Sequence, residues 1–200
     1  MEKQVLVDYI PFEVTPQQIN ESLATNGKLI VSGVLQRANA KNQNGRVYPK
    51  DTLVREAKKY AEIQIKERRA LGELDHPDSS VVNLNNVSHN VLDMNWKGDD
   101  LVGTVEVLGT PSGNILKELF KSGIKLGISS RGLGSVEEIH GADGENTVQV
   151  QPDFELIAFD FVSNPSTHGA FLSPLKEGVD KNIKPISKVE TIINDILRGE

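Results

Sequence analysis

The chain contains no cysteine, so a nucleophile would have to be a hydroxyl, an amine or a carboxylate. Ser129 and Ser130 end a short apolar run and lead into the glycine-containing segment RGLG at 131–134. A serine at the edge of a strand, followed by glycines, can place its hydroxyl at a cleft where backbone N–H groups hold an oxyanion. Adjacent strand residues point to opposite faces, so only one serine of the pair can face such a site. The plainer alternative is a strand end that leads into a tight turn.

His76 is the histidine in the most suggestive setting, because it lies in an expected loop between Asp75 and Pro77, with Glu73 nearby. An imidazole with an ordinary pKa of about 6.5 can accept a proton at pH 7. Asp160 lies inside an apolar segment, where a carboxylate is costly unless it is paired. A histidine partner would satisfy Asp160 and orient the imidazole. A solvated loop histidine and an outward-facing carboxylate are the simpler interpretations.

A metal site is the second chemistry that these residues suggest. Glu73, Asp75, His76 and His89 could supply oxygen and nitrogen ligands, but the HExxH and paired-cysteine spacings are absent. We therefore expect no metal and no other cofactor. The strand spacing around His89 favours a cross-strand or core-edge histidine.

Composition narrows the class of protein further. The 200 residues include 22 Lys and Arg against 28 Asp and Glu, a formal net charge of −6. Without a basic excess to neutralise phosphates, we expect neither nucleic acid nor an anionic membrane as a partner. No segment reads as a secretory signal or reaches the length of about 20 apolar residues that a membrane span requires. We expect a soluble intracellular protein with one main domain.

The hydrophobic pattern predicts about seven strands and two helices. Strands are expected near 4–10, 28–36, 87–96, 101–108, 126–130, 146–151 and 154–163, and helices at 51–69 and 111–122. The strands cluster around hairpins and do not alternate with helices. This pattern favours an α+β fold with a mostly antiparallel sheet or barrel.

The composition shifts near Glu177, which predicts a main domain over 1–176 and a separate tail over 177–200. The tail begins with a polar, flexible segment. Ser187 and Glu190 then form a capping box at the start of an amphipathic helical stretch. This helix could pack back on the domain, dock on a partner, or be removed by proteolysis.

Four strings in order resemble the prohead core proteases of large contractile-tailed bacteriophages, which are relatives of the herpesvirus assemblins. The strings are NQNGRVYPK (42–50), ALGELDHP (70–77), MNWKGDDLVG (94–103) and GISSRGLGS (127–135), and the similarity covers roughly 28–175. The resemblance implies a serine endopeptidase on a closed β-barrel with flanking helices.

Carried onto this chain, the resemblance implies that His76 is the general base and Ser129 the nucleophile. Asp160 matches the acidic third member of phage relatives, and His89 is the fallback, because assemblins use a second histidine. The oxyanion would sit against backbone N–H groups near Arg131 and Gly132. The Arg131 side chain could add a positive charge there, or form a salt bridge elsewhere.

The resemblance also implies cleavage of scaffold, core and major capsid proteins inside the assembling prohead, in the host cytoplasm. Cleavage is expected after Glu, with Leu or Ile two residues earlier. The string that ends at Glu177 is therefore the best candidate for self-cleavage. Activity is expected to depend on assembly or on processing of the termini, and self-association is compatible with the family. A head or scaffold protein without activity, or a metal-assisted hydrolase that uses Glu73, His76 and Asp160, are the alternatives.

Overall fold

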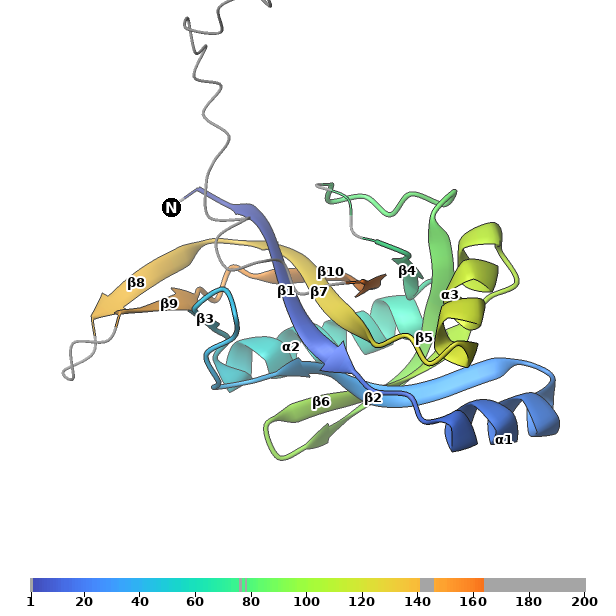
Figure 1. Cartoon of the computed structure of the whole chain (residues 1–200). Coiled ribbons are helices and arrows are strands. Elements are labelled where there is room, and N and C mark those ends of the chain that lie inside the picture. The colour runs from blue at the N-terminus through green and yellow to red at the C-terminus, as the bar shows by residue number, and fades with distance from the viewer. Residues whose placement is uncertain (1, 76, 78, 141–145, 164–200) are drawn as a thin grey trace, which may run out of the picture. The chain divides into compact units, whose positions relative to one another are not determined.

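The computed structural model describes residues 2–75, 77, 79–140 and 146–163 (Figure 1). Within these residues the chain forms three small sheets, three α-helices and one π-helical turn. The helices are α1 (Pro16–Asn26), α2 (Lys50–Tyr60), η1 (Ala61–Ile65) and α3 (Pro111–Lys121), and the strands are β1 (Gln4–Phe12), β2 (Leu29–Arg37), β3 (Arg46–Val47), β4 (Leu71–Glu73), β5 (Val87–Lys97), β6 (Asp100–Val107), β7 (Leu126–Gly134), β8 (Val136–His140), β9 (Asn146–Val150) and β10 (Glu155–Val162).

The sheet that positions the candidate site has the order β1-β7-β10, with both pairs antiparallel. The central strand β7 carries Ser129, which lies opposite Tyr9 of β1 and Asp160 of β10. A bulge interrupts the β10 ladder between Leu156 and Ala158. Because directly opposed residues share one face of a sheet, Ser129 and Asp160 are neighbours on the same face.

The described strands form two other sheets. The larger has the order β2-β6-β5-β4 and is antiparallel throughout. The third has the order β3-β9-β8 and contains the short parallel pair β3–β9. Figure 1 shows how β7 runs directly into β8, so one continuous stretch of chain contributes to two sheets.

The closed barrel expected from the resemblance is wrong for this structure. The ten described strands form three separate open sheets, and none of these sheets closes on itself. At the outer side of β10, an isolated bridge joins Phe161 to Leu74 where a barrel would need a full ladder. Alternating hydrophobicity predicts strands and their faces, but closure depends on strand tilt and stagger, which the pattern does not encode.

The segment expected to turn after Ser130 continues as a strand. Residues 131–134 remain in β7, because the glycines there make room for a neighbouring ring. A Cβ atom on Gly132 would lie 2.3 Å from the Phe154 Cε2 atom, and one on Gly134 would lie 3.0 Å from the Phe154 Cα atom. These glycines therefore permit close packing and do not mark a turn.

The helices broadly follow the expected pattern, with one addition. The helix expected at 51–69 corresponds to α2 and η1, and the one at 111–122 corresponds to α3. Helix α1 lies between the strands expected near 4–10 and 28–36, where no helix was predicted. It begins with a capping box in which the Thr15 hydroxyl accepts from the Gln18 backbone N–H and the Gln18 side chain accepts from the Thr15 N–H.

The main hydrophobic core lies on the face of the first sheet that is opposite to Ser129. Ile128 and Phe161 share that face and are completely buried, with Phe12 packed edge-on against Phe161 at a centroid separation of 5.1 Å. A smaller cluster surrounds Tyr48 and Phe154. No helix among the described residues is long and apolar enough to span a membrane. The expected boundary at 176/177, Glu177 and the tail all lie outside the described residues, so the division into 1–176 and 177–200 stays a prediction.

Candidate active site

Ser129 lies in the middle of β7 and is completely buried. Its Oγ atom has no hydrogen-bond partner among the described residues. Ser130 points to the other face, where its Oγ atom accepts from the Gln36 Nε2 atom at 2.6 Å. The alternation of strand faces thus separates the two hydroxyls. Ser130 is bonded on the core side, and Ser129 has no partner in the part of the chain that the structure describes.

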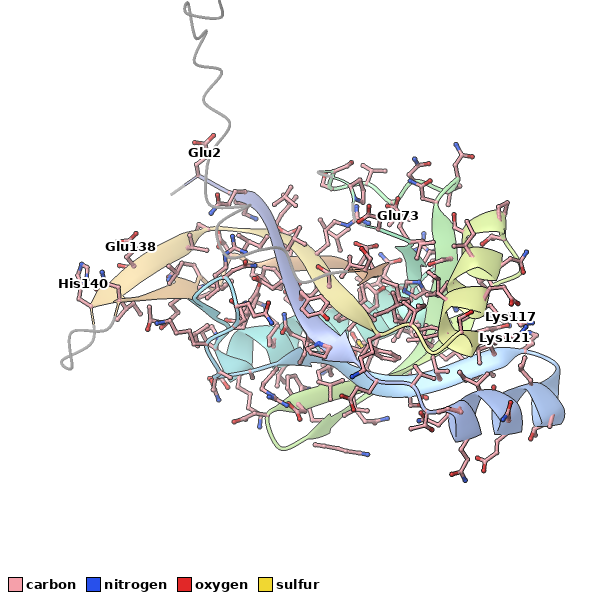
Figure 2. The ribbon with its side chains drawn as sticks, viewed as in Figure 1. Glu2, Glu73, Lys117, Lys121, Glu138 and His140 are labelled. Atoms are coloured by element: carbon pink, nitrogen blue, oxygen red, sulfur yellow. The ribbon has the colours of Figure 1, made fainter. Side chains whose placement is uncertain are left out.

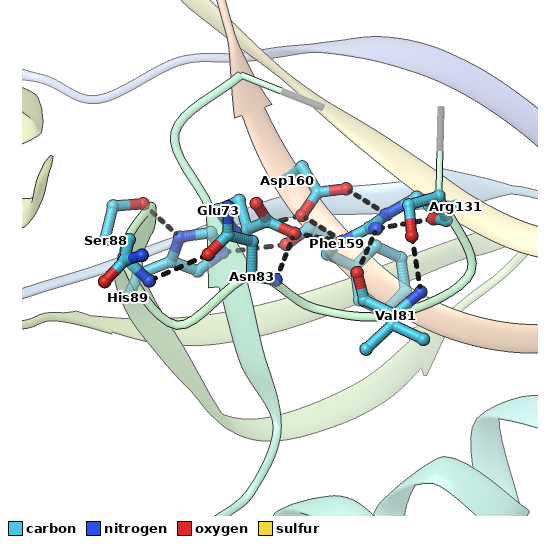
Figure 3. A network of polar contacts seen from close by, with 10 residues as sticks. Glu73, Val81, Asn83, Ser88, His89, Arg131, Phe159 and Asp160 are labelled. Carbon is cyan, nitrogen blue, oxygen red and sulfur yellow. Dashed lines mark hydrogen bonds and ion pairs between the residues drawn. The ribbon is translucent and has the colours of Figure 1, made fainter. Parts of the chain in front are cut away.

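A buried ion cluster occupies the same face as Ser129 (Figure 3). The guanidinium of Arg131 donates from Nε to the Asp160 Oδ2 atom at 2.8 Å and from Nη2 to Oδ1 at 3.2 Å. The Nη2 atom also donates to the Glu73 Oε1 atom at 2.9 Å. All three side chains are completely buried. One guanidinium therefore binds two carboxylates from strands β4 and β10.

The ion cluster also binds the chain segment that follows β4. Arg131 Nη1 donates to the Ser79 carbonyl at 2.7 Å, and the Asn83 backbone N–H donates to the Glu73 Oε1 atom at 3.0 Å. The Glu73 backbone N–H in turn donates to the Asp160 Oδ1 atom at 2.9 Å. Residues 79–83 are thus held against β7 and β10 by charge-assisted hydrogen bonds.

Asp160 is engaged at both carboxylate oxygens. Burial raises the pKa of Asp160, and the positive charge of Arg131 opposes that rise. The Oδ2 atom accepts one described bond, from Arg131, which leaves it room for a second. Asp160 can therefore bind a further donor while Arg131 keeps it oriented.

His76 lies outside the described residues, and the chain just before it is placed beside β10. Leu74 pairs with Phe161 in an isolated parallel bridge, and the Asp75 backbone N–H donates to the Phe161 carbonyl at 2.8 Å. Phe161 is the residue that follows Asp160 in β10. The described chain therefore runs to residue 75 along the strand that carries Asp160.

His89 is held by both ring nitrogens in the core. Its Nε2 atom lies 2.9 Å from the Phe159 carbonyl, which can only accept, so Nε2 carries the hydrogen and Nδ1 accepts from the Ser88 hydroxyl at 2.8 Å. Burial lowers the pKa of His89 to about 4, which keeps the ring neutral. These are the contacts of a core histidine, and the fallback catalytic role gains no support from them.

Comparison with known proteins identifies the family. The profile of the prohead core protein serine protease family matches residues 3–182. This chain belongs to that family. It is 31% identical over 172 residues to the prohead core protein protease of Enterobacteria phage T4, covering 84% of this chain and 78% of that protein. A solved structure of the bacteriophage T4 capsid assembly protease matches with a TM-score of 0.71 and 28% identity, across 82% of this chain and 100% of that chain. The family resemblance found in the sequence is confirmed.

In this prohead protease family member, the predicted oxyanion segment lies inside the sheet. Arg131 and Gly132 are paired with β1 on one side and with β10 on the other. The bulge between Leu156 and Ala158 lies opposite them and is the irregular point in that ladder. An oxyanion site at these N–H groups stays a prediction, whereas the Arg131 side chain is committed to the buried ion cluster.

No three His, Cys, Asp or Glu side chains come together as metal ligands in the part of the prohead protease that the structure describes. Glu73 and Asp160, two of the three residues considered for a metal, both bind Arg131. The guanidinium thus bridges the two carboxylates.

The residues missed in the sequence lie behind Ser130. Asp8 of β1 accepts from the Asn44 Nδ2 atom at 2.7 Å, from the Arg46 Nη1 atom at 3.1 Å and from the Tyr48 hydroxyl. Asn44, Arg46 and Tyr48 come from the string NQNGRVYPK, which was used only to recognise the family. Asp8 lies opposite Ser130, so this network ties β1 to residues 44–48 on the core side of the strand that carries Ser129.

Proposed function

We propose that this chain is a serine endopeptidase that cleaves scaffold, core and shell proteins inside the phage prohead. Its membership of a family of prohead proteases supports this reading, as does its similarity to a T4 protein named as a prohead core protein protease. The observation that carries the serine mechanism is the position of Ser129. Its hydroxyl is buried, has no partner within the described ranges, and lies directly opposite the buried carboxylate of Asp160. A strand serine with only a structural role would be expected to satisfy its hydroxyl, as Ser130 does.

The proposed mechanism uses Ser129, His76 and Asp160. His76 takes the proton from the Ser129 hydroxyl as its oxygen attacks the peptide carbonyl, and later gives that proton to the leaving amine. Asp160 orients the imidazole and stabilises its positive charge. Backbone N–H groups hold the oxyanion, each contributing about 3–4 kcal/mol to the transition state.

The burial of Ser129 supports control of activity by assembly or by processing of the termini. A peptide carbonyl cannot reach an atom with no exposed surface, so the covering chain must move before cleavage. Residues 79–83 are tied to Arg131 and Glu73 on this side of the sheet, and the proposal is that their release opens the site. A segment that moves only after assembly would keep the protease inactive until the shell has formed.

Cleavage after Glu, with Leu or Ile two residues earlier, is proposed from the family resemblance. Five strings in this chain fit the rule: Ile19-Asn20-Glu21, Ile65-Lys66-Glu67, Leu71-Gly72-Glu73, Leu116-Lys117-Glu118 and Leu175-Lys176-Glu177. The first lies within helix α1, and the second begins at the last residue of η1. Glu73 is completely buried, and Leu116 is completely buried within helix α3. These four folded strings are protected from a protease that needs an extended peptide. The remaining string, ending at Glu177, is the proposed site of self-cleavage.

Purified scaffold protein is the substrate that tests this proposal, incubated with wild type, Ser129→Ala or Ser130→Ala. We expect Ser129→Ala to lose cleavage and Ser130→Ala to keep it, because the Ser130 hydroxyl faces the core. Equal cleavage by wild type and Ser129→Ala, abolished by a chelator, would favour the metal-assisted alternative. No cleavage by any variant, in the presence of assembled shell, would favour a structural head protein.

A further inference from the structure

Glu73 contacts several parts of the site, and no role considered for it above accounts for all of these contacts. Its Oε1 atom accepts from Arg131 and from the Asn83 N–H, and its backbone N–H donates to Asp160. These three contacts join strands β4, β7 and β10 to the chain at residue 83 (Figure 3). The Oε1 atom and the backbone N–H make all three contacts, so a purely structural role would not require the second carboxylate oxygen.

The second carboxylate oxygen of Glu73 is unused. The Oε2 atom is buried and has no hydrogen-bond partner among the described residues. Asp160, in contrast, receives two bonds at Oδ1 and one at Oδ2. Leaving a buried carboxylate oxygen unsatisfied is costly, so this atom has the capacity to accept a bond from a further donor. The Oε2 atom of Glu73 therefore adds a free acceptor to the room that remains at the Asp160 Oδ2 atom.

The net charge of the ion cluster also supports a functional role for Glu73. Glu73 and Asp160 carry two negative charges when both are ionised, and Arg131 carries one positive charge, which leaves one negative charge in surplus. A buried surplus charge is unfavourable unless a cation or a proton compensates it. The imidazolium that forms when a serine gives its proton to histidine carries one positive charge, which matches this surplus.

We propose that Glu73 is a positioning residue of the proposed serine protease, acting through the catalytic imidazole. Its free Oε2 atom is a second acceptor, beside Asp160, for the ring N–H, and its charge stabilises the imidazolium formed on attack. The proton moves from the Ser129 oxygen to the imidazole and then to the leaving amine, and none is transferred to Glu73. This inference rests on the proposed function. It adds Glu73 to Asp160 as a second carboxylate that acts on the imidazole, with Arg131 bound to both.

The variant Glu73→Gln tests this role because it separates structure from charge. Gln keeps an oxygen acceptor for Arg131 and Asn83 but removes the negative charge and the free carboxylate oxygen. Glu138→Gln is the matched control, because Glu138 is exposed on β8, well separated from Glu73 in Figure 2. The assays are steady-state cleavage of a scaffold-derived peptide and the rate of Ser129 labelling by a fluorophosphonate, under conditions in which wild type cleaves scaffold protein.

We expect Glu73→Gln to lower kcat by about tenfold or more while KM stays within about twofold. The rate of Ser129 labelling should fall by a similar factor. The urea midpoint should stay at or above that of wild type, because the buried surplus charge is gone. A purely structural role would instead lower the midpoint and spare kcat in the folded enzyme.

Wild-type kcat and labelling in folded Glu73→Gln would overturn the inference, as would a loss of activity explained entirely by a smaller folded fraction. Ser129→Ala, measured in parallel, reports on the proposed function separately. If Ser129→Ala cleaves as wild type does, the proposed serine mechanism fails and this inference fails with it. If Ser129→Ala is inactive and Glu73→Gln is fully active, only the role of Glu73 is lost.

Discussion

The guanidinium of Arg131 binds both carboxylate oxygens of Asp160, at 2.8 Å from Nε to Oδ2 and 3.2 Å from Nη2 to Oδ1. Arg131 lies two residues after Ser129 on β7, so both side chains share one face of the strand. This fork-shaped pairing fixes the orientation of Asp160 beside the Ser129 hydroxyl. The carboxylate proposed to serve the imidazole is thus positioned by the same strand that carries the proposed nucleophile.

Breaking this pair should destabilise the fold strongly. Arg131→Met leaves the buried carboxylates of Glu73 and Asp160 without their cation, and we expect a loss of about 3–5 kcal/mol in the free energy of unfolding. Arg37→Met is the control, because the side chain of Arg37 is half exposed in its ion pair with Asp100, and it should cost less than about 1 kcal/mol. Urea denaturation measures both. Equal losses in the two variants would contradict the buried cluster as a stabilising unit.

His89 should make stability depend on pH in mildly acidic solution. Its pKa is lowered to about 4 in the folded protein, below the value of about 6.5 expected in the unfolded chain. The unfolded chain therefore binds more protons between these values, so stability is present above about pH 6.5 and is lost as the pH falls towards 4. The expected loss between pH 7 and pH 5 is about 2 kcal/mol.

Urea unfolding at pH 7 and pH 5, for wild type and His89→Gln, checks this effect. The variant should be less stable at pH 7 but should lose less stability on going to pH 5. An undiminished pH dependence in His89→Gln would mean that another group is responsible.

Gly132 should tolerate no side chain. A Cβ atom there would lie 2.3 Å from the Phe154 Cε2 atom and 2.6 Å from the Glu155 carbonyl oxygen. We expect Gly132→Ala to cost about 1–3 kcal/mol in the free energy of unfolding, because the ring and the β10 backbone must move. Gly109→Ala is the matched control, since a Cβ atom on Gly109 meets nothing within 4 Å. Thermal melts that place Gly132→Ala level with Gly109→Ala would refute this packing argument.

The Tyr48 hydroxyl should stabilise the protein through the Asp8 carboxylate. Tyr48→Phe removes a buried hydrogen bond to a charged group, for which we expect a loss of about 1.5–3 kcal/mol. Asn44 and Arg46 still bind Asp8 in the variant, so the protein should fold. Chemical denaturation gives the value, and a change below about 0.5 kcal/mol would show that the other donors satisfy Asp8 alone.

Local pattern in the sequence predicted the strand that carries Ser129 and the opposite orientation of Ser129 and Ser130. Both follow from the two-residue period of a strand, which requires no knowledge of the rest of the fold. The same period predicted the strand that carries Asp160, but not which face of it is buried. The identity of its partner, Arg131, depends on the register between β7 and β10, which no local pattern contains.

Three features that the sequence did not predict correctly depend on long-range packing. The glycines after Ser130 were interpreted as a turn, but Gly132 and Gly134 are needed where Phe154 packs against β7. The closed barrel was carried over from relatives, whereas the described strands form three open sheets. Arg46 and Tyr48 were recognised only as part of a family string, because their contact with Asp8 spans almost forty residues.

The most direct test of the account follows the intact mass of purified wild-type protein and of Ser129→Ala over time, with assembled shell and scaffold protein added. The account predicts that wild type alone loses its tail at the peptide bond after Glu177, while Ser129→Ala stays whole. That single result would support the nucleophile, the cleavage rule and the processing site together. Equal loss of the tail in both proteins would contradict the account, because cleavage would then not depend on the Ser129 hydroxyl.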